Sequence, residues 1–510
     1  MPLLNSLVTW LIKKRMHQID LFMKYPNEVQ NELFKKLISS AKDTEWGKKF
    51  GYNSIENIRQ FRERVPLQDY DSVKSYIERI RRGEQNILWF SKIKWFAKSS
   101  GTTSDKSKFI PVSTESLEEC HYKGGKDMLT IYCHNYPDTQ IFTGKNLPLG
   151  GSYYTDYYDN YESYHGDVSA ILMQHLPLWA EFLRASDLSI ALMSDWEEKL
   201  KKLAEVTISE NVTNIAGVPS WMLILLKRIL ELSGKETIKE IWPNLEIYFH
   251  GGVNFSPYQE NFKKIFGTSE INYLDVYNAS EGFFGLQDKK DSDELLLMLD
   301  YGIYYEFLPH EDTAKKSENV VSLNELEVGK NYAIVISTNA GLWRYQLGDT
   351  IKFTSLNPYR FKITGRTKHF INAFGEEVII ENTENALKIA CGKSGAIVKE
   401  YTVAPVYMNE SESGSHEWLI EFEKEPEDLK YFSEILDNAL KALNSDYEAK
   451  RFNNYALRAP IIRKMNEGTF YNWLKTKRKL GGQNKVPRLS NDRKYVDEIL
   501  DMLDGNTNCK

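Results

Sequence analysis

The chain has 510 residues, of which 42% are hydrophobic and 27% are charged, so it is long enough for two or three globular domains. Its 30 Tyr, 24 Phe and 11 Trp supply a large core and flat pockets that suit ring-shaped ligands. The formal net charge of −6 argues against a general nucleic-acid binder and against a membrane-surface protein.

The cysteine pattern and the first residues indicate where the protein works. The four cysteines are scattered: Cys120, Cys133, Cys391 and Cys509. They form no CxxC pair, and the nine histidines show no metal-ligand spacing, which is typical of a reducing compartment. The N-terminal stretch mixes Leu, Trp and Ile with Lys13-Lys14-Arg15, which predicts an amphipathic helix and not a signal peptide or membrane span. We therefore expect a cytoplasmic protein without stable membrane insertion.

Residues 1–90 predict successive amphipathic helices, with breaks near 48–53 and at Pro66. The stretch Phe96–Val112 then predicts two short strands around a turn of small hydroxyls and glycine. Hydroxyls, free backbone N–H groups and ammonium groups so close together are typical of a polyphosphate cradle, although a Ser/Thr-rich surface hairpin is the alternative. It is not a Walker A loop, because no second glycine precedes a Lys-Ser/Thr pair at the head of a helix. The candidate phosphate ligands are Ser99, Ser100, Gly101, Thr102, Thr103, Lys106 and Lys108.

Residues 113–240 alternate helical patterns with turns rich in Gly, Tyr and Asp. The predicted helices cover 115–134, 176–187, 194–206 and 219–233. Between the first two, Gly150-Gly151-Ser152 and the tyrosine cluster Tyr153–Tyr164 predict a loop that shapes or covers a cleft.

From Leu245 the pattern changes to strand, turn and helix in alternation, which predicts an open and largely parallel sheet. Ligands bind such sheets at the carboxyl ends of the strands, where His250-Gly251-Gly252 and Tyr277–Gly282 fall. Residues 295–355 show pure β alternation, which predicts a small antiparallel barrel or sheet packed against the parallel layer.

The remaining chain predicts a separate α+β unit. Its expected helices are 380–391 and 427–444, and its expected strands are 396–407 and 416–424. The fold class is therefore α/β, with a large N-terminal domain at 1–360 whose mainly parallel sheets are flanked by helices. That domain includes the small β-barrel part at about 295–355. A hinge at 361–368 leads to a smaller C-terminal lid domain at 369–510.

Several further segments are candidates for chemistry, and each has a plain structural alternative. Tyr277 offers a ring for stacking, and Glu281 is a carboxylate fixed at a turn, suited to a metal near phosphates. Asp349 follows Gly348 at a strand end, where a carboxylate can accept both hydroxyls of a ribose, although Gly-Asp pairs are common in β-turns. The paired glycines 251–252 let a flat ring approach the backbone, or they simply end a strand.

Taken in order, these segments are SSGTT, HGG, YxxSE, Gly-Asp, TGRTK and GGQNKVPR. Together they resemble the plant auxin-responsive family of acyl-acid amido synthetases, a branch of the acyl-adenylate-forming superfamily. The likeness begins near Leu37 and continues to Arg488, so it covers most of the chain.

The resemblance implies ATP and Mg²⁺ as cofactors and assigns roles to individual residues. Phosphate binding falls to the 99–103 segment with Lys106 and Lys108. Nucleoside binding falls to Gly251, Gly252, Tyr277, Ser280 and Asp349, with Arg366 and Lys368 at the adjoining hinge. Glu281 would help to position Mg²⁺, and Lys485 would swing in to stabilise charge that develops on the α-phosphate.

Two residues depart from the family pattern. Asp105 stands where the family usually has glycine, and a carboxylate there would repel a polyphosphate unless it faces solvent or a metal. Gln346 stands where the ribose motif usually carries arginine. Arg344, two residues earlier, could supply the missing cation.

The expected activity is that of a two-step ligase. A carboxylate attacks the α-phosphate of MgATP to give an acyl-adenylate and pyrophosphate, and then an amine, expected to be an amino acid, attacks the activated carbonyl and releases AMP. One alternative is a thioester ligase with coenzyme A or a carrier thiol as acceptor. The other is a non-enzymatic nucleotide-binding or scaffold protein of the same fold.

We expect the acid cleft between the 170–225 helices and the 277–284 turn. Candidate wall residues are Val218, Trp221, Met222 and Phe283. A core role is the alternative for each, because apolar residues at helical spacing usually pack inward. The sequence identifies neither the acid nor the amine, and it leaves the oligomeric state open.

Overall fold

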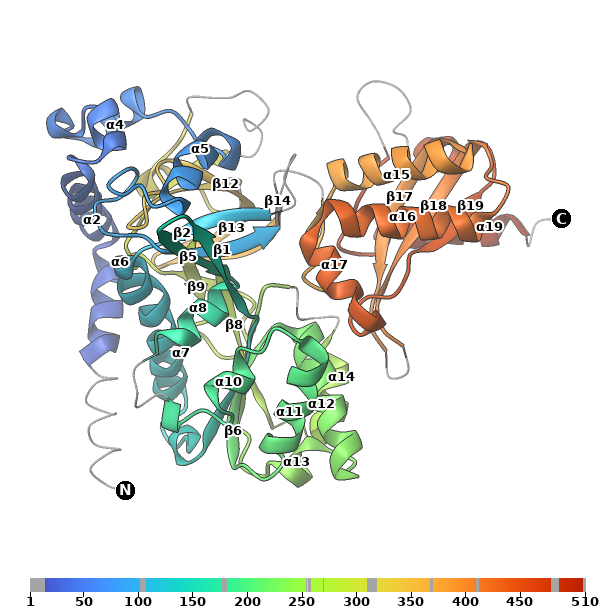
Figure 1. Ribbon diagram of the computed structural model, residues 1–510, viewed down its shortest axis with the longest axis horizontal. Coiled ribbons are helices and arrows are strands. Elements are labelled where there is room, and N and C mark those ends of the chain that lie inside the picture. Colours follow the sequence, from blue (N-terminus) through green and yellow to red (C-terminus); the bar gives the residue numbers. More distant parts are fainter. Residues whose placement is uncertain are drawn as a thin grey trace.

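The computed structural model describes the chain except residues 1–13, 101–106, 177–180, 254, 256–257, 269, 310–318, 367–369, 410–411, 478–485 and 508–510. Two parts are evident: a large part that ends at Arg366 and a smaller one that begins at Phe370 (Figure 1). No helix within the described ranges is long and apolar enough to cross a membrane.

The first part opens with the expected amphipathic helices. They are α2 (Pro26–Ala41), α3 (Glu45–Lys49), α4 (Ile58–Arg64) and α5 (Tyr70–Arg81). Their boundaries follow from capping: the Asp69 side chain accepts a hydrogen bond from the N–H of Ser72 and so starts α5. The predicted break near 48–53 is confirmed, because Gly51 adopts the left-handed conformation with φ 65°.

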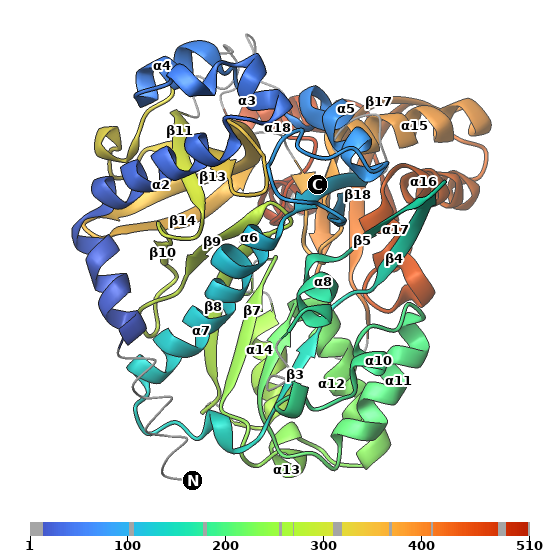
Figure 2. The same ribbon diagram turned by 60° about the vertical axis from the view of Figure 1, so that its left-hand side comes forward.

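A ten-stranded sheet forms the centre of the first part. Its parallel strands are β3 (Lys145–Leu149), β6 (Val212–Gly217), β7 (Ile247–Gly251) and β8 (Asn272–Ala279). The helices packed on one face are α11 (Trp196–Thr207), α12 (Pro219–Ser233), α13 (Ile238–Ile241) and α14 (Gln259–Phe266). Helix α7 (Tyr122–Asn135) lies on the other face (Figure 2). The predicted parallel sheet between helices is confirmed. Successive strand residues such as Tyr248 and Phe249 point to opposite faces and belong to two different hydrophobic cores, one on each face of the sheet.

Residues 282–366 continue the same sheet with antiparallel strands. These are β9 (Gly282–Leu286), β10 (Leu295–Leu297), β11 (Ile303–Pro309), β12 (Asn331–Thr338), β13 (Tyr345–Leu356) and β14 (Tyr359–Arg366). The strand order is β11-β12-β13-β14-β10-β9-β8-β7-β6-β3. The antiparallel unit is therefore present as predicted, but it joins the parallel strands edge to edge and is not a separate barrel layer. The pairing of β10 with both β9 and β14 makes this connection.

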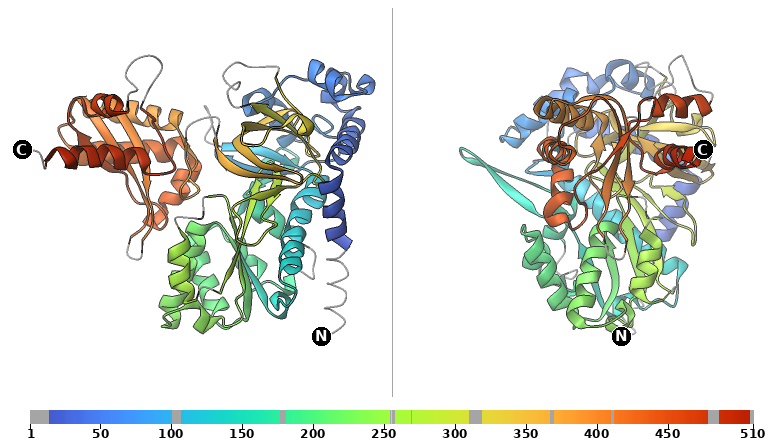
Figure 3. Two further views of the ribbon diagram at one scale, coloured as in Figure 1. Left: turned by 180° about the vertical axis from the view of Figure 1, so that it is seen from behind. Right: turned by 90° about the vertical axis from the view of Figure 1, so that its right-hand side faces the viewer.

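A second sheet of four strands has the order β2-β1-β5-β4. Its strands are β1 (Trp95–Ser100), β2 (Ser107–Val112), β4 (Tyr153–Tyr158) and β5 (Tyr161–Gly166). The prediction of a loop over Tyr153–Tyr164 is thus wrong, because Tyr153–Tyr158 and Tyr161–Gly166 pair with each other as an antiparallel hairpin. That hairpin, teal in Figure 3, projects from the body of the molecule.

The predicted helices near this sheet are only partly correct. The helix expected at 115–134 is present as α6 (Thr114–Ser116), a π-turn (Leu117–His121) and α7. Of the expected helix 176–187, the described residues 181–182 are helical, whereas residues 183–187 are not and Arg184 forms a bridge with Asn146. The neighbouring helices are α8 (Val168–Gln174) and α10 (Leu188–Ala191).

The second part is the predicted α+β unit, built on the sheet β17-β18-β19 (Ile397–Val406, Ser415–Lys424 and Ile461–Met465). Its other elements are the hairpin strands β15 (Phe370–Ile371) and β16 (Val378–Ile379) and the helices α15 (Ile380–Ser394), α16 (Leu429–Leu443), α17 (Ser445–Arg451), α18 (Thr469–Thr476) and α19 (Lys494–Thr507). Alternate residues of the sheet face α15 and α16 on one side and α18 and α19 on the other.

The two parts meet through the segment that follows the sheet. The Tyr258 hydroxyl donates to the carbonyl of Ala373 at 2.6 Å, and the Ser220 hydroxyl donates to the carbonyl of Phe374 at 3.0 Å. Residues 361–366, the first six of the eight residues predicted as the hinge, instead pair with β13 as part of strand β14 (Tyr359–Arg366). The other two, residues 367 and 368, fall outside the described ranges.

Candidate active site

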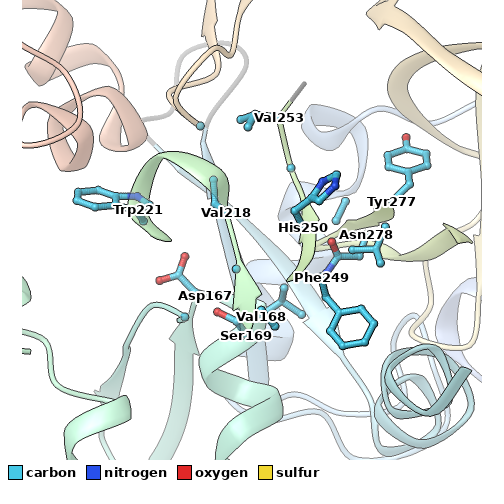
Figure 4. Close-up of a pocket in the computed structure, with 18 of the residues that line it drawn as sticks. Asp167, Val168, Ser169, Val218, Trp221, Phe249, His250, Val253, Tyr277 and Asn278 are labelled. Carbon is cyan, nitrogen blue, oxygen red and sulfur yellow. The ribbon is translucent and has the colours of Figure 1, made fainter. Parts of the chain in front are cut away.

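One large cavity lies between the two parts, with a volume of about 2500 Å³. The carboxyl ends of the parallel strands open into it, because Gly217, Gly251 and Ala279 all line its wall. Figure 4 shows Val218, His250 and Tyr277 around this space. The cavity therefore occupies the position where open α/β sheets bind ligands, as the sequence predicted.

The predicted phosphate cradle is a hairpin at the rim of this cavity. Ser99 on β1 pairs with Lys108 on β2, and both line the cavity. Beneath the hairpin, the Arg81 guanidinium lies 3.6 Å from the ring centroid of Phe109 and donates to Asp156 at 2.7 Å. Strand β2 of the hairpin is therefore held by the Arg81–Phe109 contact and by the Arg81–Asp156 ion pair next to it. Its tip, with Gly101, Thr102, Thr103 and Lys106, falls outside the described residues, as does the Ser100 side chain.

The structure brings the predicted adenine and ribose residues together. The Tyr277 hydroxyl donates a hydrogen bond to the carboxylate of Asp349, and both side chains are buried at the cavity wall. Tyr277 ends the parallel region on β8, whereas Asp349 follows Gly348 on β13. Residues 72 positions apart in the chain thus meet in one site, and the phenol orients the carboxylate that we assign to ribose.

Glu281 sits in the tight turn between β8 and β9, beside Ser280, and both line the cavity. Burial raises the pKa of Glu281, the ammonium of Lys108 opposes this rise, and the carboxylates of Glu377 and Asp349 add to it. Negative charge is therefore concentrated where a cation would relieve it.

This carboxylate cluster fits Mg²⁺ in one specific way. Within the described residues, no group of three or more His, Cys, Asp or Glu side chains is placed to hold a metal ion by itself. Mg²⁺ is commonly held by one or two carboxylates together with phosphates. Glu281 would provide one such carboxylate, and phosphate oxygens and water would complete the ligand set.

The glycine pair at the end of β7 has structural reasons as well as a place in the cavity. A Cβ on Gly251 would lie 2.3 Å from the carbonyl oxygen of Val276, so close strand packing requires glycine there. Gly252 has φ 81°, which favours glycine. His250 stacks on Phe255 with ring centroids 4.0 Å apart, and burial lowers the pKa of His250 to about 3. His250 and Phe255 therefore form a flat surface, and the imidazole of His250 is neutral.

Three of the four candidate acid-pocket residues line the cavity, and one does not. Val218, Trp221 and Phe283 line the cavity as predicted. Met222 does not, because the next position on helix α12 turns about 100° away and its side chain is fully buried in the core. The prediction for Met222 was wrong for that reason.

The suggestion that Arg344 supplies the missing cation is also wrong. Its Nε donates to Glu306 at 3.0 Å and its Nη1 donates to the carbonyl of Val65 at 2.7 Å, deep in the core. Gln346, by contrast, lines the cavity.

The side chains of three predicted site residues lie outside what the structure describes. Lys368 and Lys485 fall outside the described residues. Arg366 is described only as the end of β14, where it pairs with Asp349 across the strands.

Sequence reasoning missed a lysine that the second part contributes. Lys450 on α17 lines the cavity, and its Nζ lies 4.6 Å from the ring centroid of Trp221. Burial lowers the pKa of Lys450, whereas Asp446, Asp167 and Glu376 oppose this shift. Its only sequence signal was a basic residue near a helix end, which is usually a solvated cap, so the pattern could not have identified it.

The fold is shared with solved acyl acid amido synthetase and acyl-CoA ligase structures. Residues 15–271 match the GH3 family N-terminal domain, 296–366 match the central domain and 381–494 match the C-terminal domain. The chain belongs to the GH3 family.

Known proteins of similar sequence and structure agree with this assignment. Indole-3-acetic acid-amido synthetase GH3.3 of Arabidopsis thaliana is 26% identical, over 94% of this chain and 91% of that protein. The 4-substituted benzoates-glutamate ligase GH3.12 of the same plant is 23% identical, over 90% and 92%. The solved GH3.15 acyl acid amido synthetase has a TM-score of 0.61 at 18% identity, with 95% of both chains covered. A 2-hydroxyisobutyryl-CoA ligase has a TM-score of 0.57 at 13% identity, with 94% and 92% covered.

Proposed function

We propose that this protein is an ATP-dependent acyl acid amido synthetase that joins a carboxylic acid to an amino acid. The observation that supports this most directly is the convergence of four segments on one cavity: the 95–112 hairpin, the β8–β9 turn, the Gly348-Asp349 strand and α17. Family membership over nearly the whole chain supports the same reaction class.

In the first step a carboxylate oxygen attacks the α-phosphorus of ATP, a new P–O bond forms, and the bond to pyrophosphate breaks. Asp349 accepts the ribose hydroxyls, with Tyr277 fixing its orientation. Lys108 and the hairpin amides hold the phosphates in line for displacement. Mg²⁺ at Glu281 would neutralise the charge on the phosphate oxygens. Lys485 would approach the α-phosphate from the second part of the chain.

In the second step the amine nitrogen attacks the acyl carbonyl, loses a proton, and expels AMP. No side-chain nucleophile is needed, because the mixed anhydride is already activated. We assign residues beyond Arg366 as the hinge that lets the second part present a new face to the adenylate. The cavity between the two parts leaves room for both substrates.

The test of this function is direct product analysis. Purified protein would be incubated with MgATP, a panel of carboxylic acids and a mixture of amino acids, and products would be identified by mass spectrometry. Acid- and amino-acid-dependent amide and AMP would support the proposal. A thioester with coenzyme A, formed while no amide appears with any amino acid, would refute it.

We also propose the cytoplasm as the place of action. The scattered cysteines support a reducing compartment, and Cys120, Cys133 and Cys391 are free thiols. Fluorescence microscopy of a tagged chain would test this, and a signal confined to a membrane or outside the cell would contradict it.

A further inference from the structure

We infer that the acid substrate is a dicarboxylic acid, whose second carboxylate binds Arg184 at the inner end of the cavity. This rests on the proposed function for the first carboxylate, and it names the substrate class of the same site. Arg184 lines the cavity, yet only 7% of its side chain is exposed.

Among the described residues, Arg184 is a buried cation without an ion-pair partner. Its Nε donates to the carbonyl of Ser186 at 2.8 Å, and its Nη1 has no hydrogen-bond partner. Within the part of the chain that the structure describes, no carboxylate oxygen lies within 4.0 Å of its guanidinium. Buried arginines normally pair with an acid, because an isolated charge is costly to remove from water. A ligand carboxylate would complete the site.

Two neighbouring amides each use one N–H within the protein. Asn146 donates to the Asn214 side chain, and Asn214 donates to the Thr213 hydroxyl at 3.1 Å. Both asparagines line the cavity. The guanidinium is nevertheless the strongest donor at this end, because it carries a charge and its planar fork matches a carboxylate.

The cavity joins this end to the adenylation site along one face of the sheet. Asn214 and Ala216 of β6 both face the cavity, as alternate residues on a strand do. Asn214 precedes the carboxyl end of β6 at Gly217 by three residues, which is about 10 Å of strand. The Ala185 N–H donates to the Asn146 carbonyl at 2.8 Å, which fixes Arg184 at this depth.

The cavity wall has an apolar part, and its Phe249 pairs with Ala216, between Asn214 and the end of β6. It includes Leu129, Leu172, Met173, Phe249 and Phe283. Figure 4 shows Phe249 at the base of this space, below His250. An acid with an apolar chain and a charged group at each end matches this sequence of surfaces. A simple fatty acid of equal length would place methyl hydrogens against the guanidinium and leave the charge unpaired.

The experiment compares matched acids with matched variants. Acid-dependent ATP–pyrophosphate exchange would be measured with adipate, suberate and sebacate against hexanoate, octanoate and decanoate. We expect wild type to prefer one of the dicarboxylates over its partner, and Arg184→Met to lose about 10- to 100-fold in kcat/KM for that dicarboxylate but not for the monocarboxylate. Arg228→Met is the control, because Arg228 is an exposed arginine that pairs with Glu231 at 3.0 Å on α12.

A binding readout separates this inference from the proposed function. The thermal unfolding midpoint would be recorded with each acid for wild type, Arg184→Met and Arg228→Met. If a dicarboxylate raises the midpoint of wild type and Arg228→Met but not of Arg184→Met, the Arg184 site stands even where no acid supports exchange. If no dicarboxylate binds better than its monocarboxylate partner, or if Arg184→Met binds both as wild type does, the inference is overturned.

Discussion

At the scale of single residues, the Tyr277–Asp349 hydrogen bond is the best-defined feature of the proposed nucleotide site. Asp349→Asn keeps the shape of the side chain but removes the charge that we assign to the ribose hydroxyls. Hydrogen bonds to a charged group contribute about 1.5–3 kcal/mol, so we expect KM for ATP to rise by about 10- to 100-fold. Pyrophosphate exchange at varied ATP concentration would measure this.

Tyr277→Phe is the matched control for that variant. It keeps the ring and removes only the hydroxyl that donates to Asp349. We expect a smaller rise in KM for ATP than Asp349→Asn gives, because the carboxylate remains. Equal effects of the two variants would contradict the assignment of Asp349 to ribose.

Glu281 predicts an acid limb in the pH profile. Burial holds its pKa above the ordinary value of 4.5, and only the ionised form can help to hold Mg²⁺. Activity that needs this carboxylate is present above the raised pKa and lost as pH falls through it. We therefore expect kcat/KM for MgATP to decline at a higher pH than an ordinary glutamate would give.

Glu281→Gln provides the check on this limb. It should abolish the dependence on this group and lower exchange at every pH, with a higher Mg²⁺ requirement. An unchanged acid limb in Glu281→Gln would show that another group titrates.

Short motifs at strand ends were predictable from sequence, whereas buried cations were not. Glu281 follows β8 and the small residue Ser280, so its place in a turn could be predicted. Asp349 was expected at a strand end, but it lies inside β13 (Tyr345–Leu356), where it pairs with Arg366. Lys450 and Arg184 carry no local pattern, because their environment is made by segments distant in sequence. Arg344 shows the converse: its position two residues before Gln346 suggested a role, but it precedes β13 and its side chain pairs with Glu306 in the core.

At the scale of elements, helix α7 contains adjacent glycines with opposite surroundings. A Cβ on Gly124 would lie 2.4 Å from the ring of Phe283, whereas a Cβ on Gly125 would have no atom within 4 Å. We expect Gly125→Ala to stabilise the protein by about 1 kcal/mol through helix propensity. Gly124→Ala should destabilise it by about 1–3 kcal/mol and disturb the acid pocket.

Thermal unfolding and acid-dependent exchange of the two variants would measure both effects. Because the substitutions are identical and adjacent on one helix, their unfolded states are matched. Equal shifts in the unfolding midpoint would contradict the close packing of α7 on Phe283.

Elements with strong periodicity were predicted well, and those decided by pairing were not. Helix α12 has the bounds expected from its apolar spacing, Pro219–Ser233. Gly, Asp and Tyr in residues 150–164 predict a loop, but β4 and β5 pair with each other and β5 also pairs with β1. Residues 361–366 likewise appeared to be a linker and are held by β13.

At the scale of the whole molecule, the two parts share an apolar surface as well as a cavity. Trp221 and Tyr258 of the first part belong to the same buried cluster as Phe374 of the second. The α/β sheet and the α+β unit were both predictable from the order of elements. The continuity of the ten strands was not, because the pairing of β10 with β14 joins segments whose sequence patterns differ.

The central claim is that the protein adenylates a carboxylic acid, and acid-dependent ATP–pyrophosphate exchange tests it most directly. We expect wild type to exchange only with both Mg²⁺ and an acid from a panel that includes dicarboxylates. Lys485→Ala should lower the rate by about 100-fold or more, as loss of one group that stabilises developing charge does. ATP binding without exchange for any acid, or full exchange by Lys485→Ala, would contradict this mechanism.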